Sequence, residues 1–141
     1  MYSRMLGAVG LFSILAVGCV NTTRHANSIG ECSPGQKCHI AGILHVYRST
    51  PAWSFVIQNK THCAKIALPR EVYPEVGAWD GQRVSVLGLA FAQPASDDGD
   101  MVALSFTFKE REMALGICDY GIGIFASELE NAHGQIVRLP D

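Results

Sequence analysis

One stretch decides the fold: Gly81-Gln82-Arg83-Val84-Ser85-Val86-Leu87-Gly88-Leu89-Ala90-Phe91. Its side chains alternate in character, which is typical of a β-strand with two different faces. One face carries Val84, Val86, Gly88 and Ala90, and the other changes halfway from Arg83 and Ser85 to Leu87, Leu89 and Phe91. We therefore predict a long, curved strand over 82–91 whose two ends meet different neighbours. Gly88 is the position at which this strand bends or admits another backbone.

Four further segments alternate in the same way and are predicted strands: 38–47, 53–58, 63–68 and 101–109. Between the predicted strand at 63–68 and the one at 82–91, which we call the organising strand, Val72, Val76 and Trp79 recur at helical spacing. Pro74 limits any helix there to a short, irregular turn. Residues 110–141 are compatible with strand, loop or helix. The chain is thus expected to be mainly β with one short helical connection.

This order of elements resembles that of OB-folds, in which five strands form a barrel with a helix between the third and the fourth. The Val-x-Val-x-Gly pattern of residues 84–88 and the strand spacing carry the resemblance, which covers residues 38–109. It implies an OB-like five-stranded barrel core at 38–109 with an extension at 110–141, in a single domain spanning 32–141. The alternative is an immunoglobulin-like β-sandwich, which needs about seven strands.

The N-terminus has the features of an export signal. A short apolar run, residues 5–17, is too short to span a membrane comfortably and ends in Leu15-Ala16-Val17-Gly18-Cys19. This ending resembles the lipobox of bacterial lipoproteins, where the cysteine is lipidated and becomes the first mature residue. The resemblance implies a signal peptide at 1–18, a lipid on Cys19, and anchoring in the cell envelope, at the outer membrane and facing the periplasm. Residues 19–31 are then a flexible tether, and ordinary signal-peptidase cleavage after Gly18 is the alternative.

Four cysteines remain if Cys19 carries the lipid: Cys32, Cys38, Cys63 and Cys118. An even number in an exported chain indicates two disulfides, for which three connectivities exist. We predict a local Cys32–Cys38 bridge and a Cys63–Cys118 bridge, because Cys63 faces away from the core and can pin the C-terminal extension over its strand. The Cys38-His39 and His62-Cys63 pairs suggest zinc, but strand neighbours point to opposite faces, so no metal site is predicted.

Charge argues against nucleic acid as the partner. The chain has 11 basic and 13 acidic residues, and one of the basic ones, Arg4, lies in the leader, so the mature chain is mildly acidic. Nucleic-acid binding draws most of its sequence-independent affinity from a basic surface. The loop after the organising strand carries Asp97, Asp98 and Asp100, which would repel phosphates.

The candidate binding residues lie in two loops that flank the ligand face of OB-folds. They are Tyr47, Arg48 and Trp53 in the first loop and Asp97, Asp98 and Asp100 in the second. With no catalytic motif and no cofactor signal, we expect a membrane-anchored, non-catalytic binding module for an envelope protein or a glycan. Two alternatives are an immunity or inhibitor lipoprotein that blocks a secreted effector, and an envelope hydrolase or thiol enzyme.

Overall fold

A computed structural model describes residues 25–94, 105–118 and 121–141. Eight strands dominate it, and its helices are short. The strands are β1 (Lys37–Tyr47), β2 (Ser54–Gln58), β3 (Cys63–Ala67), β4 (Arg83–Ala92), β5 (Ser105–Phe108), β6 (Arg111–Ala114), β7 (Ile122–Asn131) and β8 (Ile136–Arg138). The helical turns are η1 (Ile29–Glu31), η2 (Arg70–Val72) and α1 (Tyr73–Gly77).

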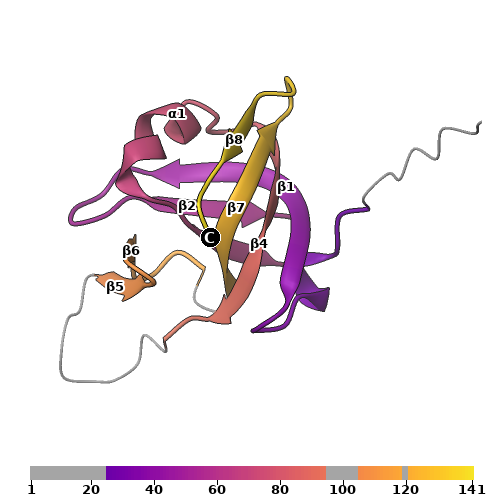
Figure 1. The fold of residues 1–141 in the computed structure, drawn as a ribbon, viewed down its shortest axis with the longest axis horizontal. Coiled ribbons are helices and arrows are strands. Elements are labelled where there is room, and N and C mark those ends of the chain that lie inside the picture. Colours follow the sequence, from indigo (N-terminus) through magenta and orange to yellow (C-terminus); the bar gives the residue numbers. More distant parts are fainter. Residues whose placement is uncertain (1–24, 95–104, 119–120) are drawn as a thin grey trace, which may run out of the picture.

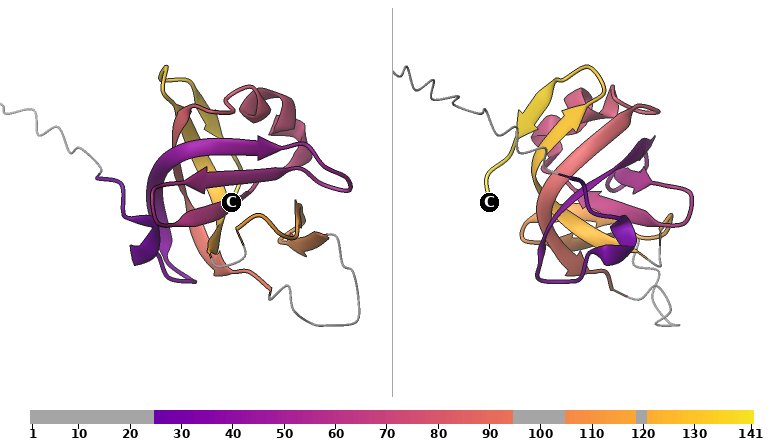
Figure 2. Two further views of the ribbon diagram at one scale, coloured as in Figure 1. Left: turned by 180° about the vertical axis from the view of Figure 1, so that it is seen from behind. Right: turned by 90° about the vertical axis from the view of Figure 1, so that its right-hand side faces the viewer.

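Five strands close into a small barrel (Figures 1 and 2). The main sheet runs β3-β2-β1-β4-β7-β8, and a parallel pairing of β3 with β7 closes the barrel, with β8 added beside β7. All other pairs in the barrel are antiparallel. This is the predicted mainly β fold: an OB-like barrel with a short helical connection between the third and fourth strands.

The organising strand is β4, which pairs with β1 on one side and β7 on the other. Val84, Val86 and Ala90 point into the core, as predicted, with exposed fractions of 1% or less. The register with β7 shifts between Leu87 and Gly88, and a Cβ atom on Gly88 would lie 2.1 Å from the carbonyl oxygen of Phe125. The expected close approach of another backbone at Gly88 is confirmed, and a bulge or irregularity in the pairing lies beside it.

The prediction that residues 101–109 form the fifth barrel strand is wrong. The fifth strand is β7, which lies in the segment expected to be an extension, so the barrel runs from β1 to β7 and not from 38 to 109. Residues 105–114 form a separate hairpin, β5–β6. Alternation identified Phe106 and Phe108 as strand residues, but it does not reveal which strand they pair with.

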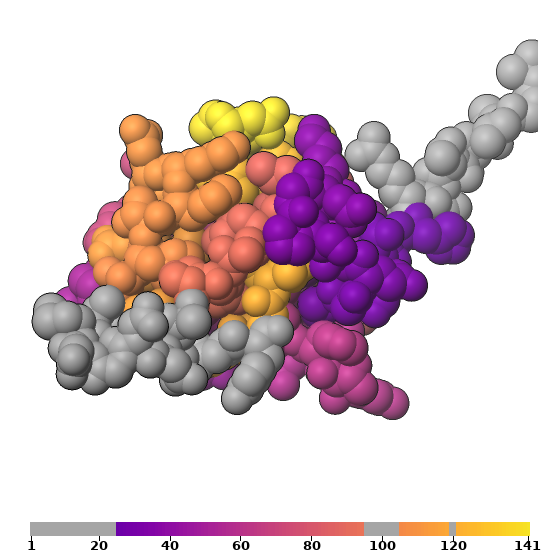
Figure 3. All heavy atoms as spheres, turned by 90° about the horizontal axis from the view of Figure 1, so that it is seen from below, coloured from indigo at the N-terminus to yellow at the C-terminus, as the bar shows by residue number. Residues whose placement is uncertain are grey.

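The hairpin lies on the outside of the barrel, beside β4 and β7 (orange in Figure 3). A second apolar cluster holds it there, separate from the barrel core, and contains Ala67, Phe91, Met113, Phe125, Leu89, Phe106 and Phe108. Phe91 and Phe108 stack with ring centroids 4.0 Å apart. This explains why the outward face of β4 becomes apolar halfway along: its second half is covered by the hairpin.

The chain between β3 and β4 closes one end of the barrel. Tyr73–Gly77 forms a single helical stretch with Pro74 near its start, where a missing N–H costs no hydrogen bond. Val76 and Trp79 are buried in the core. The predicted short helical connection is therefore confirmed.

Residues 27–31, expected to belong to a flexible tether over 19–31, are part of the domain. Ile29 is buried in the barrel core, and Asn27 forms a parallel bridge with Ile40 of β1. The Glu31 carboxylate accepts a hydrogen bond from the Ser28 N–H at 2.9 Å and so closes the η1 turn. Ile29, an apolar residue in a polar segment, thus fastens residues 27–31 to the domain. Cys19 lies outside the described residues.

Candidate functional site

The first-loop residues fasten the β1–β2 loop to α1. Arg48 lies 5.0 Å above the Trp53 ring and donates a hydrogen bond to the Gly77 carbonyl at 3.4 Å. Trp53 also stacks on Tyr73, with centroids 5.4 Å apart. Both side chains predicted to bind a ligand therefore contact their own chain, whereas Tyr47 stays 40% exposed on the outer face of β1.

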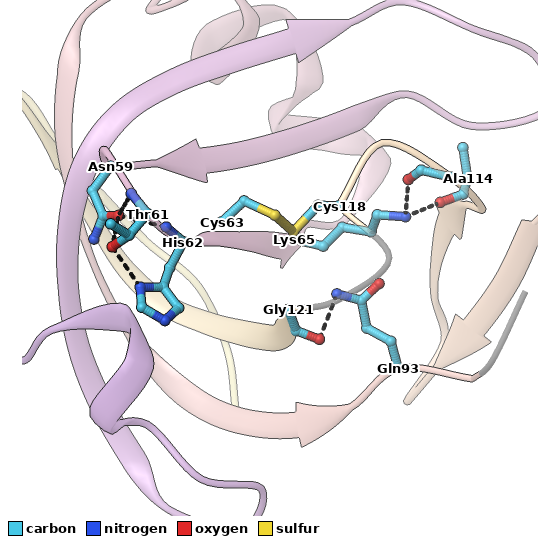
Figure 4. Close-up of a disulfide and its surroundings, with 10 residues drawn as sticks. Asn59, Thr61, His62, Cys63, Lys65, Gln93, Ala114, Cys118 and Gly121 are labelled. Carbon is cyan, nitrogen blue, oxygen red and sulfur yellow. Dashed lines mark hydrogen bonds between the residues drawn. A yellow bond between two sulfur atoms is a disulfide. The ribbon is translucent and has the colours of Figure 1, made fainter.

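The second-loop residues, Asp97, Asp98 and Asp100, lie outside the described residues. Gln93, which precedes this loop, donates a side-chain hydrogen bond to the Gly121 carbonyl at 3.1 Å (Figure 4). The structure therefore does not place the aspartates relative to Tyr47, Arg48 or Trp53.

An open cleft of about 820 Å³ lies between η2, the β5–β6 hairpin and the C-terminal residues. Its apolar lining comes from Leu68, Pro69, Val72, Phe125, Leu139 and Pro140. Its charged lining comes from Arg70, Lys109, Arg111 and Arg138 on the basic side and Glu71, Glu110, Glu112 and Asp141 on the acidic side. Residues within 68–72, 107–112 and 138–141, together with Phe125, thus form one concave surface.

An ion pair fixes one rim of the cleft. Arg70 donates to the Glu112 carboxylate at 2.5 Å and to the Pro51 carbonyl at 2.8 Å, and so links η2, β6 and the β1–β2 loop. The hydroxyl of Ser105 donates to the other Glu112 oxygen at 2.8 Å. The Arg70 and Ser105 hydrogen bonds hold the pKa of Glu112 below its usual value, so this carboxylate stays ionised at neutral pH.

Buried Arg111 lies beneath the cleft. Its guanidinium donates to the carbonyls of Ala67 at 3.0 Å, Ala126 at 2.7 Å and Pro140 at 2.8 Å, and stacks 3.6 Å above the Phe125 ring. Burial lowers the pKa of Arg111 from a very high ordinary value, and the nearby Asp141 opposes this change. The residue joins the hairpin to β3, β7 and the C-terminal residues, and its charge is satisfied by carbonyls.

Two carboxylates at the mouth of the cleft are unpaired. Among the described residues, the exposed carboxylates of Glu71 and Glu110 take part in no hydrogen bond or ion pair. Of the basic groups, Arg70 and Arg138 are paired with Glu112 and Glu128, and Lys109 lies over the Phe108 and Phe125 rings. The cleft therefore offers two unpaired carboxylates beside an apolar wall, while Lys109 keeps its charge over the aromatic rings, and the two carboxylates suit a cationic ligand.

Sequence reasoning missed all of these cleft residues. The one signal was a two-residue turn, Lys109-Glu110, between two short alternating segments. Lys and Glu are not the residues that such hairpin turns favour, yet both have positive φ angles here, 45° and 67°. The residue types at positions 109 and 110 therefore did not indicate a hairpin turn.

The predicted Cys63–Cys118 disulfide is confirmed, with the two Cα atoms 5.9 Å apart (Figure 4). Cys63 faces outward from β3, and the bridge pins the chain that leads into β7. The predicted Cys32–Cys38 bridge is not formed: both residues are buried free thiols. Burial, followed by the hydrogen bond with Cys38, raises the pKa of Cys32 to about 12, which disfavours the thiolate that disulfide formation requires.

In the native protein, Cys32 should resist iodoacetamide at pH 8. With a pKa of about 12 against an ordinary value near 8.5, its thiolate fraction falls by roughly a thousandfold. The contribution of protonated Cys32 to the free energy of unfolding is complete below its unfolded pKa of about 8.5. It is lost as the pH rises toward the pKa of about 12 in the folded protein. Alkylation followed by mass spectrometry, native and in urea, measures this protection. A Cys32–Cys38 linked peptide from unreduced protein, or equal labelling in both conditions, would contradict it.

Within the described ranges, no helix has the length and apolarity needed to cross a membrane. In the same part of the chain, no three His, Cys, Asp or Glu side chains gather as metal ligands. No protein-family model matches the chain, and no curated protein matches its sequence.

Proposed function

We propose that this protein is an exported, lipid-anchored and non-catalytic binding module, and that its cleft holds a basic segment of a protein partner in the cell envelope. The observation that carries the proposal is the pair of free carboxylates, Glu71 and Glu110, at the mouth of a cleft with an apolar wall. Export and lipidation rest on the lipobox-like ending at Cys19.

A protein partner is favoured over a glycan by the state of the aromatic residues. Glycan sites present an aromatic ring to the sugar, but Trp53 already contacts Arg48 and Tyr73, exposed Tyr47 lies outside the cleft, and the aromatic residue that lines the cleft, Phe125, is only 7% exposed. The charged groups around the cleft also favour binding over catalysis. The pKa of Glu112 is lowered and burial raises that of Tyr73, so each keeps one charge state near neutral pH.

Fluorescence anisotropy with labelled peptides tests the proposed ligand. An Arg- and Lys-rich peptide should bind at low salt, and more weakly as ionic strength rises, because surface charges are screened. The Glu71→Gln, Glu110→Gln double variant should weaken this binding about tenfold, which corresponds to about 0.7 kcal/mol per rim charge.

The matched control is Glu75→Gln, Glu130→Gln, which removes two exposed carboxylates outside the cleft and changes the net charge equally. It should leave binding nearly unchanged. Equal losses in both double variants, or equal binding of a Glu-rich peptide, would refute the cleft as the site.

Lipidation is tested by metabolic labelling with a fatty acid in a Gram-negative host. The wild type should carry the label and fractionate with membranes, whereas Cys19→Ser should be unlabelled because the acceptor thiol is gone. Recovery of soluble, unlabelled wild type that has lost residues 1–18 would show ordinary secretion instead.

A further inference from the structure

The outer face of β2 and β3 is buried although it does not belong to the barrel core. Phe55, Ile57, Ala64 and Ile66 point inward, so the alternating residues point outward. Yet Ser54, Val56, Lys65 and Ala67 are only 0%, 3%, 0% and 0% exposed. In OB-like barrels this face is the one open to ligands. Here residues 111–116 lie over at least the β3 side of it, where Lys65 bonds to the Ala114 and Gly116 carbonyls and Arg111 to that of Ala67.

Two buried cations fasten that segment in opposite directions. Lys65 reaches outward from β3 and donates to the carbonyls of Ala114 at 2.6 Å and Gly116 at 2.7 Å (Figure 4). Arg111 reaches back from the hairpin to the carbonyls of Ala67 and Ala126. These contacts join two preformed surfaces, and the barrel strands remain fully paired without them.

The segment also carries unusual strain. All four non-glycine residues with positive φ in the described ranges lie in it: Lys109, Glu110, Ile117 at 58° and Cys118 at 116°. A β-branched residue such as Ile117 is a genuine outlier there, and such strain persists only where the surroundings enforce it. On the outer face of β2, the buried Ser54 hydroxyl has no hydrogen-bond partner, which is costly in a permanent interior.

We propose that residues 105–118 are a removable cover over the outer β2–β3 face, and that the Cys63–Cys118 disulfide locks it shut. A dithiol reductant would open the lock. It transfers two electrons and two protons, the S–S bond breaks to give the Cys63 and Cys118 thiols, and the dithiol becomes a disulfide. The strained turn at 116–118 then relaxes and the hairpin detaches, exposing Lys65 among apolar side chains. Because β6 also forms one wall of the cleft, opening would dismantle the cleft, but the cover does not depend on the proposed ligand.

Amine labelling of Lys65 tests the lock directly. With an N-hydroxysuccinimide ester, Lys65 should be unreactive in the oxidised protein. It should react at least about tenfold faster after reduction with dithiothreitol, capping of the new thiols with iodoacetamide and removal of both reagents, since the closed loop constrains the segment. Exposed Lys60, at the β2–β3 turn, should label equally in both states. The Cys63→Ser, Cys118→Ser variant should label like the reduced wild type.

Hydrogen exchange distinguishes opening from unfolding. Amides of β5 and β6 should exchange faster after reduction, whereas those of β1 and β4 keep their protection. The Cys32→Ala, Cys38→Ala variant retains the disulfide and should still respond to dithiothreitol. The proposal is overturned if Lys65 stays protected after reduction, or if β1 and β4 lose protection together with the hairpin.

Discussion

Replacing Arg111 with methionine should lower the free energy of unfolding by about 4 kcal/mol, which is within the range for breaking a buried charged contact. Methionine keeps much of the side-chain volume and its contact with Phe125 but donates no hydrogen bond. The carbonyls of Ala67, Ala126 and Pro140 would lose their shared donor. Each unsatisfied buried acceptor costs about 1–3 kcal/mol. We expect the three carbonyls together to cost less than three times the upper value, because water can reach some of them. Urea denaturation followed by circular dichroism measures the change.

Arg138→Met is the matched control. Arg138 also lines the cleft, but its side chain is 73% exposed and its partner Glu128 is 34% exposed. Surface pairs of this kind contribute about 0–1 kcal/mol. The two variants should therefore differ by about 3 kcal/mol. A loss under ~1 kcal/mol for Arg111→Met would mean that the hairpin is not fastened through this residue.

Gly88→Ala should destabilise the barrel by about 3 kcal/mol, at the upper end of the cost of overpacking. The added methyl would lie 2.1 Å from the Phe125 oxygen and 2.9 Å from the Ala126 Cα. Both are backbone atoms of β7, so no side chain can rotate away, and β4 and β7 must separate at their bulge. The same urea titration measures the change.

Ser85→Ala, three residues earlier on the same strand, is the control for Gly88→Ala. Ser85 faces outward and is half-buried, so its substitution should change stability by less than about 0.5 kcal/mol. If Gly88→Ala were as mild, the close approach of β4 and β7 at the bulge would be wrong.

Local pattern was enough to predict four of the five barrel strands. Val84, Val86 and Ala90 alternate because β4 has one face in the core, and Cys63 points outward for the same reason, which allowed its bridge to Cys118 to be predicted. The fifth strand could not be chosen in this way. Phe106 and Phe108 alternate as well as Ile122 and Ile124 do, and only the long-range pairing of β7 with β3 decides between them.

The candidate site was harder to predict for a related reason. Glu71 and Glu110 meet at one cleft because the hairpin lies on the barrel, where Arg111 and Lys65 donate hydrogen bonds across the contact. In a sequence, a buried arginine or lysine looks the same as a solvated one. The first-loop aromatic residue Trp53 showed the opposite problem: a residue type typical of binding faces is used here to hold the loop on α1.

Chemical-shift mapping of the ¹⁵N-labelled protein with an Arg- and Lys-rich peptide tests the central claim most directly. The proposed site predicts the largest shifts at Glu71, Val72, Glu110 and Leu139, with little change at Ile43 and His45 on the outer face of β1. A Glu-rich peptide should leave the cleft amides unshifted. Shifts centred on β1, or the same cleft shifts with both peptides, would contradict the assignment of this cleft as a site for basic protein segments.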